Sequence, residues 1–162
     1  MSCQRLLPGV LAPSDRVQAS YHLHLDPVPR LVSEARRFVL GHAPELDPDT
    51  QDALVLLTSE LVTNAVLHAR TPIEVGIVIA ETSVLVTVHD LDLARPDQDP
   101  YAQREGGWGL GLVSALASAA SLTPHPDGGK TAWFTLPRTG ASPAADAAAA
   151  RAGGFEGAGG AS

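Results

Sequence analysis

Two polar side chains stand one helical turn apart inside an otherwise apolar segment of the sequence. Glu60 and Asn64 lie within residues 53–69, where Leu, Val and Ala predominate, and this pattern predicts a helix that is buried on all sides. The four-residue spacing places both side chains on one stripe. Because burying an unpaired polar group costs roughly 2 kcal/mol or more, the pair predicts a site. Carboxylate and amide oxygens suit Mg²⁺, and a carboxylate polarises a hydroxyl. The alternative is a polar stripe that faces solvent.

A second candidate, Asp90, closes the apolar strand predicted for residues 83–90 and precedes a polar loop at residues 91–107. A structureless loop of that length in a small domain is usually functional, and residues on loops often belong to sites. A carboxylate there can accept a hydrogen bond from an exocyclic amine such as that of adenine. An aspartate that only caps the turn is the simpler alternative.

A run of glycines between Gly106 and Gly111 leads directly into a helix predicted for residues 109–120. Glycines let backbone amides approach a ligand, and a helix N-terminus favours phosphate. The run lacks the Gly-Lys-Ser/Thr ending of a Walker loop. It also does not follow the first strand, as the glycines of a dinucleotide-binding fold do. On its own, the run is equally compatible with a hinge.

Taken in order, these segments resemble the sequence boxes of the ATPase superfamily that includes gyrase, histidine kinases and MutL (GHKL). Residues 60–69 resemble its N box, Asp90 stands where its G1 box has an aspartate, and residues 107–111 resemble its G2 box. Residues 128–134 are similar to the last strand of a small branch, the anti-sigma-factor serine/threonine kinases of the RsbW and SpoIIAB type. The resemblance spans about residues 21–136.

The resemblance implies a Bergerat fold that binds ATP with Mg²⁺. Asn64 would ligate Mg²⁺, Glu60 would act as general base on a serine or threonine hydroxyl, and Asp90 would accept from the adenine amino group. The other residues that it assigns supply backbone amides for the phosphates or line the adenine pocket: Gly107, Gly109, Leu110, Gly111 and Thr131. Arg104, the only basic residue near these glycines in the sequence, is a candidate phosphate contact.

The leading hypothesis is an ATP-dependent protein serine/threonine kinase that sequesters a sigma factor and phosphorylates the antagonist protein that releases it. A homodimer is also expected from the resemblance. One departure favours an alternative: Asp92 and Ala94 replace the two glycines of the superfamily's Asp-x-Gly-x-Gly pattern. That alternative is a catalytically weak or inactive regulator, ATP-binding or ATP-independent, that acts by partner binding alone.

A third hypothesis is a small hydrolase that pairs His68 or His89 with Asp90. Neighbouring strand residues point to opposite faces of a sheet, so His89 and Asp90 are not expected to act together. His68 is more simply explained as a histidine at a helix end that a backbone carbonyl satisfies. This hypothesis therefore ranks below the other two.

Composition limits the class of protein. The chain has 162 residues, 44% hydrophobic and 18% charged, which suits one globular domain. Its net charge of -7 disfavours direct binding to nucleic acid, and no apolar run of about 18 residues predicts a membrane span. Cys3 is the single cysteine, which fits a reducing, cytoplasmic location. We expect an irregular extension at 1–19, one ATPase domain at 20–137 and a disordered Ala/Gly-rich tail at 138–162.

The elements that would position these residues form a mixed series. Asp47 and Pro48 have the N-cap and first-turn pattern of a helix that continues to about residue 69. Strands that are adjacent in sequence, with helices that do not alternate regularly with them, predict an α+β, Bergerat-type two-layer sandwich. In it the helices cover one face of a mainly antiparallel, mixed sheet. The patterns predict strands at 20–25, 73–80, 83–90, 122–125 and 130–136 and further helices at 27–41 and 109–120.

Overall fold

The computed structural model describes residues 9–28, 30–68, 71–90, 115–126 and 128–138. In these ranges the elements follow the chain in the order β1 (Val17–Leu25), α1 (Leu31–His42), α2 (Pro48–His68), β2 (Ile73–Ala80), β3 (Ser83–Asp90), β4 (Ala119–Pro124) and β5 (Lys130–Pro137). In this part of the chain, no helix is long and apolar enough to span a membrane.

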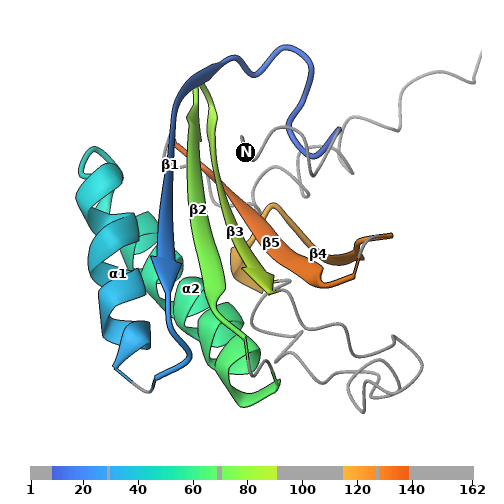
Figure 1. Ribbon diagram of the computed structural model, residues 1–162. Coiled ribbons are helices and arrows are strands. Elements are labelled where there is room, and N and C mark those ends of the chain that lie inside the picture. The colour runs from blue at the N-terminus through green and yellow to red at the C-terminus, as the bar shows by residue number, and fades with distance from the viewer. Residues whose placement is uncertain (1–8, 29, 69–70, 91–114, 127, 139–162) are drawn as a thin grey trace, which may run out of the picture.

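The five described strands form one sheet in the order β1-β2-β3-β5-β4. Each neighbouring pair of strands is antiparallel. Helices α1 and α2 both lie on the same face of this sheet (Figure 1). The arrangement confirms the predicted α+β two-layer sandwich.

Most element bounds agree with the sequence patterns, and two of the differences have a clear cause. Strands β2 and β3 have the predicted bounds. Strand β1 begins at Val17, earlier than predicted, because its first residues still pair with the end of β2, with Val17 opposite Ala80. Helix α1 begins at Leu31 rather than at residue 27. The reason is that Val28 precedes Pro29, and the residue before a proline is disfavoured in the helical conformation.

The prediction that a helix extends to residue 120 is wrong at its end. Ala119 and Ala120 are the first residues of β4, where they pair with Thr135 and Phe134 of β5. Alanine is the best helix former, but its advantage over most residues is below about 1 kcal/mol. Pairing with the edge of the sheet therefore overrides the local preference. Residues 109–114 of the predicted helix lie outside the described residues.

Helix α2 begins as predicted, with Asp47 as its cap. The Asp47 carboxylate accepts a hydrogen bond from the Thr50 hydroxyl at 2.6 Å and another from the Thr50 backbone N–H at 3.0 Å. The second bond satisfies one of the N–H groups that have no partner within a helix at its start. Both bonds lower the pKa of Asp47, and the bond from the Thr50 hydroxyl has the larger effect.

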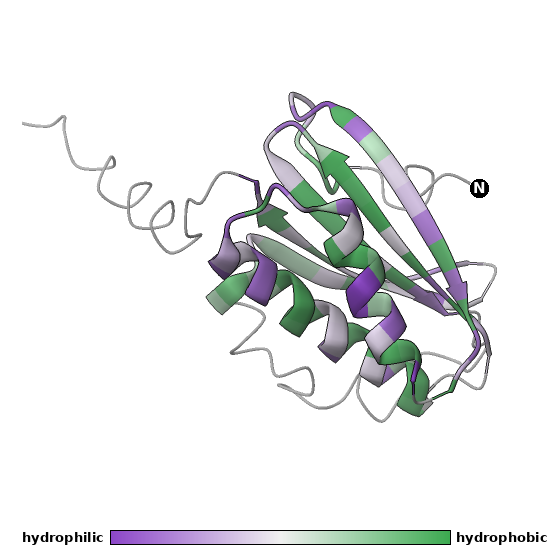
Figure 2. Ribbon diagram, turned by 90° about the vertical axis from the view of Figure 1, so that its left-hand side faces the viewer, coloured by the Kyte–Doolittle hydropathy of each residue, from purple (hydrophilic) through white to green (hydrophobic). Residues whose placement is uncertain are grey.

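The main core lies between the sheet and the two helices. Side chains alternate along a strand, so every second residue of each strand faces the helices. Ile77 of β2, Phe134 of β5 and Leu54 of α2 are among the core residues with essentially no exposed surface. Figure 2 shows the contrast between the mixed hydropathy of the edge strand β1 and the largely apolar central strands.

The opposite, outer face of the sheet is covered in part by the segment that precedes β1. Val10 and Leu11 of this segment pack against Val78 of β2 and Leu85 of β3, which are both buried. Residues that the sequence patterns leave without regular structure thus contribute a second, smaller apolar cluster.

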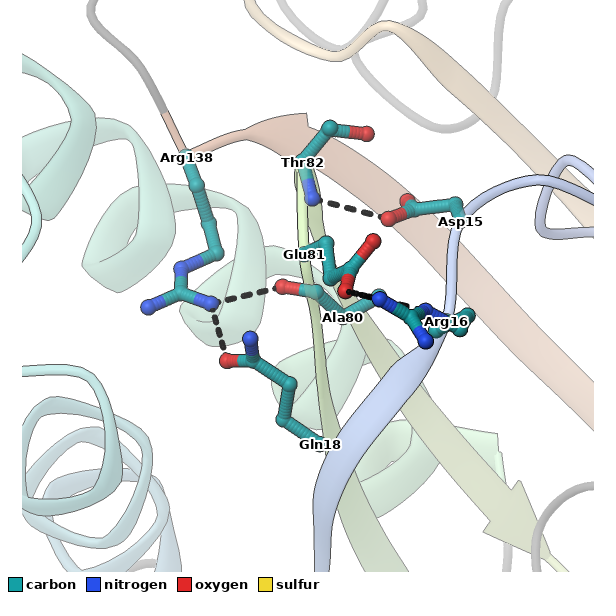
Figure 3. A network of polar contacts seen from close by, with 7 residues as sticks. All are labelled: Asp15, Arg16, Gln18, Ala80, Glu81, Thr82 and Arg138. Atoms are coloured by element: carbon teal, nitrogen blue, oxygen red, sulfur yellow. Dashed lines mark hydrogen bonds and ion pairs between the residues drawn. The ribbon is translucent and has the colours of Figure 1, made fainter.

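A polar network holds this segment to the turn between β2 and β3 (Figure 3). Asp15 accepts a hydrogen bond from the Thr82 backbone N–H at 2.8 Å and a second one from the Ser83 hydroxyl. Arg16 forms an ion pair with Glu81 at 2.7 Å. Burial alone would raise the pKa of Asp15, but its hydrogen bonds from Ser83 and Thr82 together outweigh that effect and lower the pKa.

Arg138 joins the same end of the sheet to the helical layer. One guanidinium nitrogen donates to the side chain of Gln18 at 2.6 Å and to the carbonyl of Ala80 at 2.7 Å (Figure 3). Another nitrogen forms an ion pair with Glu45 at 2.6 Å. The first residue of the predicted tail is therefore bound to β1, to β2 and to the connection between the helices.

Candidate functional site

Glu60 and Asn64 lie in the second half of α2, and both are half-buried. Leu61 and Ala65 beside them belong to the buried face of the helix. The pair therefore stands at the border between the apolar core and the accessible surface. Within the described part of the chain, neither side chain forms a hydrogen bond or an ion pair with another residue. A carboxylate and an amide are thus available to a ligand, on one stripe, as their spacing predicts.

The prediction that α2 is buried on all sides is wrong. Leu67 is 68% exposed and Leu56 is 38% exposed. In a two-layer sandwich a helix packs on the sheet and on its neighbouring helix, and its remaining side meets solvent. The apolar residues on that outer side are therefore exposed, and an apolar composition by itself does not show that a side of the helix is buried. His68 is the last residue of α2, and its side chain lies outside the described residues.

Asp90 is the last residue of β3 and is only 3% exposed. Val86 and Val88 of the same strand belong to the core under the helices, so alternation turns Asp90 toward the helical layer as well. Helix α2 packs against β3 and β5, and its C-terminal end lies at the same end of the sheet as the end of β3 (Figure 1). The structure therefore brings Asp90 to the face of the sheet that is covered by the helix carrying Glu60 and Asn64.

Thr131 lies on the other face of the sheet. Its hydroxyl is hydrogen-bonded with His89 Nδ1 at 3.0 Å and with His125 Nε2 at 2.6 Å, and the two imidazole rings are 5.0 Å apart. His89 and Asp90 consequently point to opposite faces, as alternation along the strand predicts. The structure therefore does not bring Thr131 to the face on which Asp90 lies, and a role for Thr131 in an adenine pocket stays a prediction.

Lys130 is a residue that the sequence patterns did not single out for the site. It is the β5 residue directly opposite Asp90 in the antiparallel register, and it is half-buried. Two residues that face each other across an antiparallel pair share one face of the sheet. The signal available in the sequence was that Lys130 is the only lysine of the chain and follows directly on a predicted turn.

The remaining candidates lie outside the described residues, and their roles stay predictions. They are Arg104, Gly107, Gly109, Leu110 and Gly111, together with the loop at 91–107.

The described residues fit a magnesium ion that takes most of its ligands from a bound nucleotide and from water. Among them, no group of three or more His, Cys, Asp or Glu side chains could hold a metal ion. Mg²⁺ bound with a nucleotide needs fewer protein ligands, because phosphates and waters supply most of its oxygens. Asn64 is half-buried and its side chain has no partner in the described part of the chain, so its amide oxygen suits the role of a single protein ligand.

A family model described as the histidine kinase-like ATPase domain matches residues 25–136, from the end of β1 almost to the end of β5. The chain belongs to this family. Glu60, Asn64, Asp90 and Lys130 all lie within the matched range, and membership of the family implies that this ATPase domain binds ATP. No curated protein matches the chain.

A solved structure is also similar to this ATPase domain. It contains the RsbU and RsbW domains of Rv1364c from Mycobacterium tuberculosis, with 26% sequence identity and a TM-score of 0.56. The match covers 74% of this chain and 32% of that one, so the chain spans about a third of the larger structure. The resemblance to proteins of the RsbW type that the motifs indicate is confirmed.

Proposed function

We propose that this histidine kinase-like ATPase domain is an ATP-dependent protein serine/threonine kinase that acts as an anti-sigma factor. The observation that carries the proposal is the pair Glu60 and Asn64, which stand one turn apart with no partner in the described part of the chain. Their helix covers the face of the sheet toward which Asp90 points. A hydroxyl group and a metal-bound phosphate complement a carboxylate and an amide in this position. The similarity to a structure that contains an RsbW domain supports the same assignment.

Each of these residues has a distinct part in the proposed reaction. Glu60 accepts the proton of a serine or threonine hydroxyl while that oxygen bonds to the terminal phosphorus of ATP and the bond from that phosphorus to ADP breaks. Asn64 would hold Mg²⁺, which neutralises charge on the phosphates. Asp90 would orient the adenine ring of ATP by accepting a hydrogen bond from its amino group. Phosphoryl transfer depends mainly on such positioning and charge neutralisation, and it needs no covalent step on the enzyme.

The proposed partners are a sigma factor, which the protein would sequester, and an antagonist protein, which would supply the hydroxyl. The proposal also includes a homodimer and a cytoplasmic location. The net charge of -7 argues against direct contact with nucleic acid, because an acidic surface repels the phosphate backbone.

The kinase proposal is tested with γ-labelled ATP, Mg²⁺ and the antagonist proteins encoded in the same genome. We expect label on an antagonist, a loss of about 100-fold or more in the rate for Glu60→Gln, and ATP affinity within a few-fold of the wild type in that variant. Asn64→Ala should weaken binding of ATP in the presence of Mg²⁺. Asp52→Asn, which changes an exposed carboxylate on the same helix, serves as the matched control and should not alter the rate.

Two results would count against this function. If the wild type labels none of the antagonists, the protein is not a kinase of this kind. If Glu60→Gln transfers phosphate at the rate of the wild type, Glu60 is not the base.

A second candidate function is a regulator that binds ATP and a partner without transferring phosphate. The observation that favours it is the replacement of the two glycines of the G1 pattern by Asp92 and Ala94. Calorimetry separates the two functions when it is combined with the labelling assay. ATP binding without transfer supports the regulator, whereas binding with transfer supports the kinase.

A further inference from the structure

Lys130 lies next to the residue that is proposed to recognise adenine, on the neighbouring strand of the sheet. It stands opposite Asp90 in the register of β3 and β5. Side chains at such positions lie on the same face, with Cβ atoms roughly 4.5–5.5 Å apart. The half-buried Lys130 thus belongs to the face of the sheet that the helices cover, at the end of the sheet where β3 ends. We propose that Lys130 is a specificity-determining residue of the base pocket, whose ammonium donates to ring nitrogen N1 of adenine. The inference rests on the proposed function, in which Asp90 accepts a hydrogen bond from the adenine of ATP.

The chemistry of the two side chains matches one edge of the base. Adenine presents an amino group, which donates, next to N1, which accepts. An ionised carboxylate only accepts hydrogen bonds, and an ammonium group only donates them. Asp90 and Lys130 are neighbours across two strands, so the same face of the sheet carries an acceptor and a donor next to each other, and this edge of adenine requires both. Either side chain alone would fit many ligands, whereas the pair selects for an edge that carries both groups.

The placement of Thr131 strengthens the case for Lys130. Side chains alternate along β5, so only one of these two neighbours can face the helical layer. Thr131 faces the outer side, where its hydroxyl is hydrogen-bonded with His89 and His125. Of the two residues at the start of β5, Lys130 is the one on the same face as Asp90.

A simpler role for Lys130 would be a positive charge that attracts the triphosphate from a distance or supports the fold. Such a role would not depend on a single atom of the base. The test therefore compares ATP with 1-deaza-ATP, in which N1 is replaced by a C–H group. Affinities of the full chain for both nucleotides, with Mg²⁺, are measured by calorimetry for the wild type, Lys130→Met and Lys130→Arg.

We expect the wild type to bind 1-deaza-ATP about tenfold more weakly than ATP, the usual effect of losing one hydrogen bond to a charged group. Lys130→Met should bind ATP about tenfold more weakly than the wild type and should no longer distinguish the two nucleotides. Lys130→Arg, which keeps a charged donor, should retain part of the preference. Arg16→Met is the control. It removes one positive charge from an exposed residue just before β1, at the end of the sheet opposite Lys130, and should keep the full preference for ATP.

The inference is overturned if the wild type binds both nucleotides equally well, or if Lys130→Met still prefers ATP about tenfold. Should Lys130→Met fail to fold, equal binding of the two nucleotides by the wild type, or an undiminished preference for ATP in Lys130→Arg, would still overturn the inference. A wild type that binds neither nucleotide would instead refute the proposed function itself, so the two failures can be told apart.

Discussion

Replacing Asp15 by alanine removes the acceptor that holds the segment before β1 to the turn between β2 and β3. In the wild type this carboxylate is 8% exposed, and it accepts from the Thr82 backbone N–H and from the Ser83 hydroxyl. Hydrogen bonds to a charged group contribute about 1.5–3 kcal/mol each, and they are not fully additive when they share an acceptor. We therefore expect Asp15→Ala to lower the free energy of unfolding by about 2–3 kcal/mol.

The size of this loss makes it measurable. For a domain of this length, about 1 kcal/mol corresponds to a shift in melting temperature of roughly 2–4 °C, so the variant should melt roughly 4–12 °C below the wild type. Urea unfolding followed by circular dichroism measures the free energy directly. Asp26→Ala, which removes an exposed carboxylate just after β1, is the matched control and should lie within about 0.5 kcal/mol of the wild type.

The pH dependence gives an independent check on the cause. Because folding lowers the pKa of Asp15, its contribution is fully present above the unfolded pKa of about 3.9. That contribution is lost as the pH falls through the folded value. The difference in stability between the wild type and Asp15→Ala should therefore be constant near neutral pH and should narrow below about pH 4. A variant as stable as the wild type at pH 7, or a difference that grows in acid, would refute this account of the network.

Two further predictions concern α2. Thr58 is fully buried, and its hydroxyl has no hydrogen-bond partner in the described part of the chain. Thr58→Val removes this unpaired polar group and should therefore raise the free energy of unfolding by about 1 kcal/mol. A urea midpoint below that of the wild type would contradict this prediction. Asp47→Ala removes the acceptor for the Thr50 backbone and hydroxyl groups and should lower the melting temperature. Asp47→Asn, which keeps an acceptor oxygen, should lose less, and equal losses would show that the cap is not the cause.

Local patterns predicted the parts of the fold that local chemistry controls. The cap at Asp47, the bounds of β2 and β3 and the turn before β5 all follow from residues within a few positions of each other. Gly128 and Gly129 both have positive φ, which glycine adopts readily, and the His125 N–H donates to the Gly129 carbonyl at 3.0 Å. Where the local signal was ambiguous, as in the alanines at the start of β4, the sheet decided the outcome.

The candidate site was predictable only in part. The spacing of Glu60 and Asn64 fixes their common stripe, because the helical repeat is a local property. The apolar composition around them did not show which side of α2 is covered, and Leu56 and Leu67 prove to be exposed. Burial depends on what packs against the helix, and the helix sequence does not contain that information.

What the sequence determined by itself is a set of element types, one capped helix and a carboxylate–amide pair at fixed spacing, since each depends on neighbours along the chain. Only the tertiary structure decided that Lys130, and not Thr131, stands on the same face as Asp90. The physical reason is that a shift of one residue in strand register turns every side chain of the strand to the other face. That register is set by packing between segments some forty residues apart, which no local pattern can encode.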